Sequence, residues 1–137
     1  MSEHRYLRAY MAGITVPTVF LLVVATVFTI ARYVYDVPVP IERVIVFPMA
    51  VVPNVWGLWN VLFLVLRARW DYSIGLHGAL LPVLVAPLGA AVVGILEIPV
   101  PSFVTHVLPV AAPIGLILYY LAWKYIVGFF NQVLDLA

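Results

Sequence analysis

The sequence predicts an all-α integral membrane protein, a single transmembrane domain over residues 1–137, with four transmembrane helices formed by two tandem helical hairpins. Three observations support this fold class. First, 66% of the 137 residues are hydrophobic and 9% are charged, which leaves too few polar groups to cover a water-soluble domain. Second, four apolar stretches are each about 20 residues long, the length that crosses a ~30 Å hydrocarbon core. Third, the two halves of the chain repeat one pattern of prolines.

Each predicted span is an apolar segment without interior charge. The spans cover residues 11–31, 44–66, 76–96 and 103–123, and none carries Asp, Glu, Lys or Arg in its interior. Such a segment is stable in lipid as a helix because a helix satisfies its own backbone hydrogen bonds. The lipid bilayer is therefore the expected surroundings of these four segments.

The repeat is clearest in the two loops that follow the first and third spans. Residues 36–40 and 97–101 share the pattern acid, β-branched residue, Pro, Val, Pro, and they lie 61 positions apart. Proline fixes its own φ and restricts the residue before it, so each loop is predicted to be a stiff corner. We predict repeat one over residues 9–70 and repeat two over residues 74–130. Each repeat contains two spans, so both face the same way, as in a parallel repeat.

Prolines also interrupt the predicted spans, where they remove helical hydrogen bonds. Transmembrane helices tolerate this when neighbouring helices or hydroxyl groups satisfy the freed carbonyls, and we therefore expect kinked helices. Pro48 and Pro109 have an alternative position at the first turn of a helix, where a proline loses no hydrogen bond. The prolines within the spans are Pro17, Pro48, Pro53, Pro82, Pro87, Pro109 and Pro113.

Basic residues near the span ends predict the orientation. Five fall on one side and two on the other, which places both termini in the cytoplasm and the Pro-Val-Pro loops outside the inner (plasma) membrane. At the outer ends we expect ion pairs of Arg32 with Asp36 and of Glu42 with Arg43. We also expect Trp123 to belong to an aromatic belt at the cytoplasmic interface. The five basic residues are Arg5, Arg8, Arg67, Arg69 and Lys124, and the two are Arg32 and Arg43.

Two asparagines are the most polar groups deep inside the spans. An amide in lipid needs a hydrogen-bonding partner, which is usually another helix. We therefore interpret Asn54 and Asn60 as interhelical packing groups, with the lining of a polar pore as the alternative.

Two histidines are weak candidates for cofactor binding. His77 is predicted at the cytoplasmic entrance of the third span and His106 near the outer end of the fourth. Each could singly ligate a haem iron or a pigment magnesium. Their separation by most of the bilayer excludes a shared haem, and an interfacial histidine bonded to a carbonyl or water is the favoured interpretation.

Small residues, together with Pro82, recur every four positions from Gly78 to Gly94 along the third span and predict a helix-packing face. Gly78, Ala86, Ala90 and Gly94 carry this face, and such stripes let helix backbones approach closely in lipid. A similar stripe begins in the first span with Ala9, Gly13 and Pro17.

Chemistry-bearing groups are sparse, which predicts a protein that is not an enzyme. The chain has no cysteine, no predicted catalytic residue set and no clustered metal ligands, so we expect neither metal nor cofactor. A net charge of +1 argues against nucleic-acid binding. The leading hypothesis is a membrane protein that acts through helix packing, as an accessory or scaffold subunit of a larger assembly or as a homo-oligomer. A passive channel or facilitator for a small solute or ion is the alternative, and a pigment- or haem-binding subunit is the weaker one.

Overall fold

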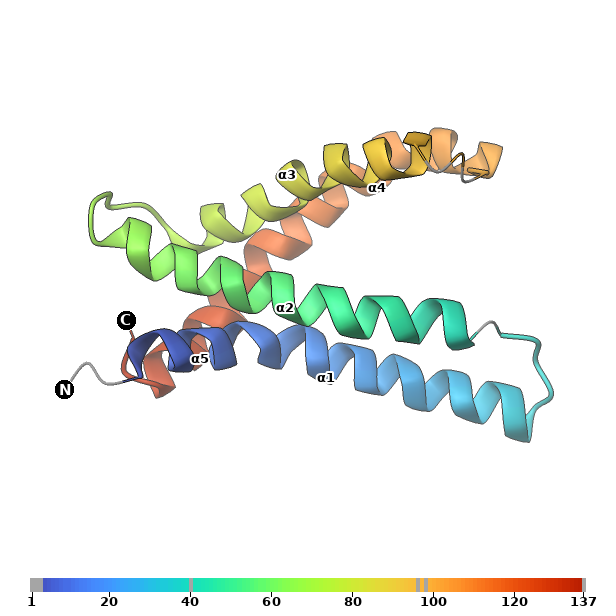
Figure 1. The fold of residues 1–137 in the computed structure, drawn as a ribbon, viewed down its shortest axis with the longest axis horizontal. Coiled ribbons are helices and arrows are strands. Elements are labelled where there is room, and N and C mark those ends of the chain that lie inside the picture. Colours follow the sequence, from blue (N-terminus) through green and yellow to red (C-terminus); the bar gives the residue numbers. More distant parts are fainter. Residues whose placement is uncertain (1–3, 40, 96, 98, 137) are drawn as a thin grey trace. The chain divides into compact units, whose positions relative to one another are not determined.

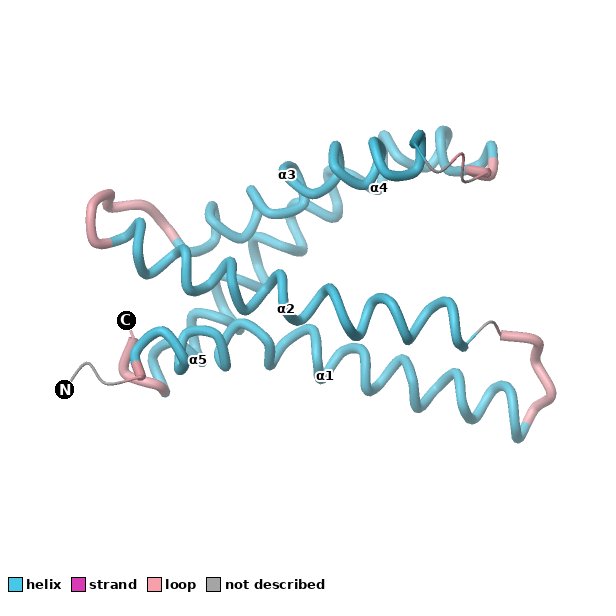
Figure 2. Tube along the Cα trace, viewed as in Figure 1, coloured by secondary structure: helices cyan, strands magenta, loops and turns pink. Residues whose placement is uncertain are grey.

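The computed structural model describes residues 4–39, 41–95, 97 and 99–136, and every regular element in this part of the chain is a helix. In chain order these are α1 (Arg5–Val34), α2 (Ile41–Arg67), α3 (Ile74–Ile95), α4 (Ser102–Leu121), a π-helical turn η1 (Ala122–Val127) and α5 (Gly128–Val133) (Figure 1). Short loops separate α1 from α2, α2 from α3 and α3 from α4 (Figure 2). The all-α prediction is confirmed for the described residues.

Four helices in the described part of the chain are long and apolar enough to cross a membrane. They are Arg5–Val34, Pro48–Arg67, Ile74–Ile95 and Ser102–Val133, and each contains most or all of one predicted span. The last is longer than expected, because η1 and α5 continue the helix beyond Trp123. These four helices indicate a membrane protein.

The chain divides into two compact units. The first unit contains α1, α2 and the chain end from Phe130 onward, and the second comprises Trp70–Phe129. In the first unit α1 and α2 lie side by side as an antiparallel hairpin. In the second unit α3 packs against both α4 and η1.

The α1–α2 hairpin is held by a close approach of the two helix backbones. Gly13 is buried, and a Cβ placed on it would lie 2.5 Å from the Trp56 carbonyl oxygen and 2.8 Å from Gly57 Cα. Ala9 and Pro17, one helical turn to either side, are buried on the same face of α1. The small-residue stripe at the start of the first span therefore packs against α2.

The second unit uses glycine in the same way, but against aromatic rings. A Cβ on Gly75 would lie 2.7 Å from the Tyr120 ring, and one on Gly78 would lie 2.0 Å from Trp123 Cγ. Trp123 belongs to η1, a π-helical turn, which carries one extra residue per hydrogen-bonded ring relative to an α-helix. The predicted belt position of Trp123 is wrong, because its side chain is fully buried.

The loop after α1 and the loop after α3 share an unusual backbone feature. Asp36 and Glu97, the acids that open the two matched motifs, both adopt left-handed conformations, with φ of 52° and 50°. This conformation commonly follows the last turn of a helix, although glycine is its usual occupant. After Asp36, the Val39 N–H donates to the Val37 carbonyl and the Ile41 N–H donates to the Val39 carbonyl, which closes two tight turns.

The prolines of the predicted spans all lie inside helices. Pro17 is in α1, Pro82 and Pro87 are in α3, and the remaining four are in α2 and α4. The alternative in which Pro48 or Pro109 opens its helix is wrong, because α2 already begins at Ile41 and α4 at Ser102.

Candidate functional site

A pair of buried amides joins the chain end to the α1–α2 hairpin. Asn60 Nδ2 donates to Asn131 Oδ1 at 2.8 Å, and Asn131 Nδ2 donates back to Asn60 Oδ1 at 3.0 Å. Asn60 Nδ2 also donates to the Ala9 carbonyl of α1 at 2.8 Å. Asn60 is fully buried and Asn131 nearly so. This amide pair therefore links α1, α2 and α5 in one hydrogen-bonded set.

The chain end has a second polar attachment close to this pair. Arg8 Nη1 on α1 donates to the Leu134 carbonyl at 3.0 Å, and the Leu136 N–H donates to the Asn131 carbonyl at 2.8 Å. Leu136 is itself buried. Residues 131–136 are thus fixed to the first unit by both polar and apolar contacts.

Asn54 differs from Asn60 because its side chain is exposed. The Tyr10 hydroxyl on α1 donates to Asn54 Oδ1, and Asn54 Nδ2 donates to the Ala50 carbonyl at 2.6 Å, one turn earlier in α2. Asn54 thus connects α1 with α2 at the surface, whereas Asn60 does so in the core.

His77 lies in an aromatic enclosure within the second unit. Its side chain is 1% exposed, its Nδ1 is 2.6 Å from the Tyr72 hydroxyl, and its ring meets Trp123 edge-on with centroids 5.7 Å apart. Burial raises the pKa of Tyr72, so this phenol stays protonated and is available as a donor to Nδ1. A haem or pigment at His77 would have to displace the side chains that enclose it.

His106 is exposed near the start of α4. Its Nδ1 lies 2.9 Å from the Ser102 carbonyl oxygen, and a carbonyl can only accept, so Nδ1 carries the proton. This hydrogen bond is local to α4, and a cofactor-binding role of His106 stays a prediction. The described residues contain no group of three or more His, Cys, Asp or Glu side chains suited to a metal ion.

The predicted helix-packing face is divided between two environments. Gly78 is buried against Trp123, whereas Ala86, Ala90 and Gly94 are exposed. A Cβ on Gly94 would meet nothing within 4 Å, and the same holds for Gly89 and for Gly115 of α4. Within the second unit, only the N-terminal end of this face, at Gly78, packs against a described neighbour.

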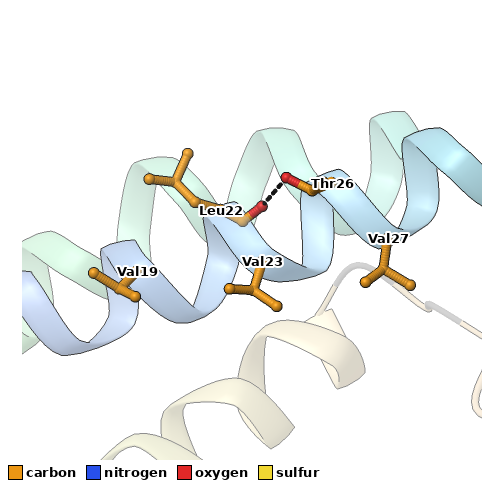
Figure 3. Close-up of a pocket in the computed structure, with 5 residues that line it drawn as sticks. All are labelled: Val19, Leu22, Val23, Thr26 and Val27. Carbon is orange, nitrogen blue, oxygen red and sulfur yellow. Dashed lines mark hydrogen bonds between the residues drawn. The ribbon is translucent and has the colours of Figure 1, made fainter.

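An apolar hollow of about 280 Å³ runs along α1 (Figure 3). It is lined by Val19, Leu22, Val23, Thr26 and Val27. The one hydroxyl in this set, on Thr26, donates to the Leu22 carbonyl at 2.8 Å. The hollow therefore offers no polar path to a solute, and the pore-lining role of Asn54 and Asn60 stays a prediction.

One ion pair joins α1 to α2 at the end of the hairpin where the two helices are connected. Arg32 Nη1 lies 2.8 Å from Glu42 Oε1. The expected pairing of Arg32 with Asp36 is wrong, because the left-handed corner brings the start of α2 back to Arg32. The side chain of Arg43 lies outside the described residues, so its expected pairing with Glu42 is not addressed. A bond from the Glu42 backbone N–H, and then the Arg32 guanidinium, lower the pKa of the Glu42 carboxyl.

Several of these residues escaped the sequence reasoning. Asn131 lies beyond the predicted fourth span, and the sequence singled out neither Tyr10 nor Tyr72 as a hydrogen-bonding group. The Tyr10 hydroxyl meets a partner 44 positions away, and the Tyr72 hydroxyl meets one 5 positions away. The partner of the Asn131 amide is 71 positions away. A polar residue within an apolar helix signals that a partner is needed, but it does not identify the partner.

Comparison with known proteins gives no relative. No protein-family model, no characterised protein and no solved structure matches this chain.

Proposed function

We propose that this chain is a non-enzymatic, multi-pass protein of the inner (plasma) membrane that acts by packing against other membrane helices. It does so as an accessory or scaffold subunit of a larger assembly or as a homo-oligomer. The observation that carries this proposal is the contrast between two sets of glycines in the same chain.

The first set of glycines has a use within the chain. Gly13, Gly57, Gly75 and Gly78 lie where a Cβ would come within 2.0 to 2.7 Å of a neighbouring group, so a larger residue would force that neighbour to move. The second set, Gly89, Gly94 and Gly115, faces open space. Glycine inside a helix costs about 1 kcal/mol relative to alanine, and close backbone contact between helices in lipid is its usual compensation.

A partner helix would supply that compensation. Ala86 and Ala90 lie on the same side of α3 as Gly94 and are also exposed, so within the second unit this face is smooth and uncovered. Prolines inside α3 and α4 also leave carbonyls without a helical hydrogen bond, and neighbouring helices are one source of donors for them. The proposal includes a kinked α3 and a kinked α4, with the kinks at these prolines.

The tandem-repeat organisation and the orientation are part of the proposal as well. The matched left-handed residues at Asp36 and Glu97 support a common origin for the two outer corners. The five-to-two distribution of basic residues supports cytoplasmic termini.

The test is the composition and mass of the particle extracted from its native membrane in a mild detergent, with its absorption spectrum. We expect a particle larger than one chain, without a visible chromophore. Ala86→Leu and Ala90→Leu should shrink the particle, because leucine prevents close helix approach. Ala91→Leu is the matched control, since it lies about 100° round the helix from Ala90. A lone monomer, or a particle that both variants leave intact, would contradict the proposal.

A further inference from the structure

Asn54 is an exposed amide at membrane depth. It lies in the apolar helix Pro48–Arg67, roughly 9 Å along the axis from Pro48 and roughly 20 Å from Arg67 at 1.5 Å per residue. Its two hydrogen bonds, to the Tyr10 hydroxyl and the Ala50 carbonyl, both stay within the chain. A polar group facing lipid at this depth is costly and usually finds a partner in another helix.

The amide has capacity for such a partner. A primary amide offers two N–H donors and two acceptor sites on its oxygen. Asn54 uses one donor on Ala50 and one acceptor site on Tyr10, which leaves one of each. The remaining pair is self-complementary, because one amide can donate to and accept from an identical amide.

The surface around Asn54 has the spacing of a helix-association seam. Exposed apolar residues flank it at intervals of three or four positions, and at 100° per residue the five fall within about 80° of arc. They lie opposite the side of α2 that carries the buried Trp56 and Asn60. The seam consists of Val51, Asn54, Leu58, Leu62 and Val65. An apolar seam with one asparagine is a pattern that specifies partner register in packed helices.

We propose that this seam binds a second copy of the same chain, with Asn54 of each copy hydrogen-bonded to Asn54 of the other. This inference rests on the proposed function, because it names a partner and adds a second contact surface, on α2, to the small-residue face of α3. All copies of a membrane protein insert with one orientation, so a twofold axis along the membrane normal brings each residue to the depth of its counterpart. Asn54 of one copy therefore meets Asn54 of the other, and no second polar residue is needed. A different protein would need an amide or carboxamide-like group placed independently at the same level.

The absence of cysteine makes the test direct, because a single introduced cysteine is the only thiol. Leu58→Cys lies on the seam beside Asn54, and residues near a twofold axis cross-link to themselves. Leu88→Cys is the matched control, since it is a leucine of similar exposure in α3, away from the small-residue face. We expect oxidation of native membranes to give a covalent dimer of the Leu58→Cys chain and none of the Leu88→Cys chain.

Second-site changes test the role of the amide. In the Leu58→Cys background, Asn54→Leu should reduce dimer formation and weaken association about five- to thirty-fold. Tyr10→Phe removes the intrachain bond to Asn54 but keeps the seam amide, so it should leave cross-linking intact and control for damage to the hairpin.

The outcomes separate this inference from the proposed function. Equal cross-linking of the Leu58→Cys and Leu88→Cys chains, or cross-linking unaffected by Asn54→Leu, would overturn the Asn54 seam. If the seam fails while the extracted particle still contains further subunits, the helix-packing function stands and its partner binds elsewhere. A monomeric particle without partners would overturn both.

Discussion

At the scale of single residues, the buried amides explain how a polar group is accommodated in an apolar protein. Asn60 and Asn131 satisfy each other reciprocally, and the spare hydrogen of Asn60 reaches the Ala9 carbonyl. Removing one partner strands donors and acceptors in the core, which costs more than the net value of the bond itself. The two residues are therefore expected to behave as a unit.

Asn131→Leu should lower the free energy of unfolding by about 1–3 kcal/mol, because it leaves the Asn60 amide buried with an unpaired donor and acceptor. The double variant Asn60→Leu, Asn131→Leu should lose less than the sum of the single variants. Unfolding in detergent, followed by tryptophan fluorescence, measures both effects. Gln132→Leu, at the exposed neighbouring position, is the control, and an equal loss in that variant would argue against a specific amide pair.

The Arg32–Glu42 pair predicts a pH response at the loop end of the α1–α2 hairpin. The pKa of Glu42 is lower in the folded chain than the ordinary value of about 4.3. Its contribution to stability is therefore complete above that ordinary value and is lost as the pH falls through the folded pKa. NMR titration of the carboxyl should give a depressed pKa that rises only part of the way in Arg32→Met, because the backbone N–H bond remains. An unchanged pKa in that variant would show that the guanidinium does not act on Glu42.

At the scale of helices, glycine has opposite consequences at the two ends of α3. Gly78→Ala should destabilise the second unit by about 1–3 kcal/mol, since the new Cβ would meet Trp123 Cγ at 2.0 Å and force the π-helical turn to move. Gly94→Ala should leave the isolated chain unchanged or stabilise it by up to about 1 kcal/mol, because nothing lies within 4 Å. Thermal unfolding of the two variants in one detergent compares them directly. Equal midpoints would mean that Trp123 adjusts at no cost.

The same contrast shows how far sequence reasoning reaches. The four helices were predictable, because the length of an apolar stretch and the absence of charge are local properties. The different surroundings of Gly78 and Gly94 were not predictable, since both belong to the same stripe of residues spaced four positions apart. What separates them is Trp123, which lies 45 positions after Gly78 and is turned inward within a π-helical turn. Asn60 was recognised as an interhelical group, but its partner Asn131 is 71 positions away.

At the scale of the whole molecule, the chain alternates between two kinds of loop. The corners that contain Asp36 and Glu97 are acidic and rich in proline, whereas the connection between α2 and α3 follows Arg67 and contains Arg69. Helices that cross a membrane in succession place alternate loops on opposite sides. Both acidic corners should therefore lie on one side, and residues 68–73 on the other.

Single cysteines in the otherwise cysteine-free chain test this topology. Val37→Cys and Val100→Cys lie in the two acidic corners, are exposed and avoid the prolines, and Asp71→Cys lies in the basic connection. In intact cells whose inner membrane is accessible, a membrane-impermeant maleimide should label Val37→Cys and Val100→Cys. It should leave Asp71→Cys unlabelled. Inverted vesicles should reverse the pattern, which controls for thiols that are merely unreactive. Labelling of Val37→Cys and Val100→Cys from opposite sides would contradict the parallel repeat, because hairpins of two spans each must return the chain to its starting side. Labelling of Asp71→Cys from outside, with both corners protected, would preserve the parallel repeat but reverse the orientation that the basic residues predict.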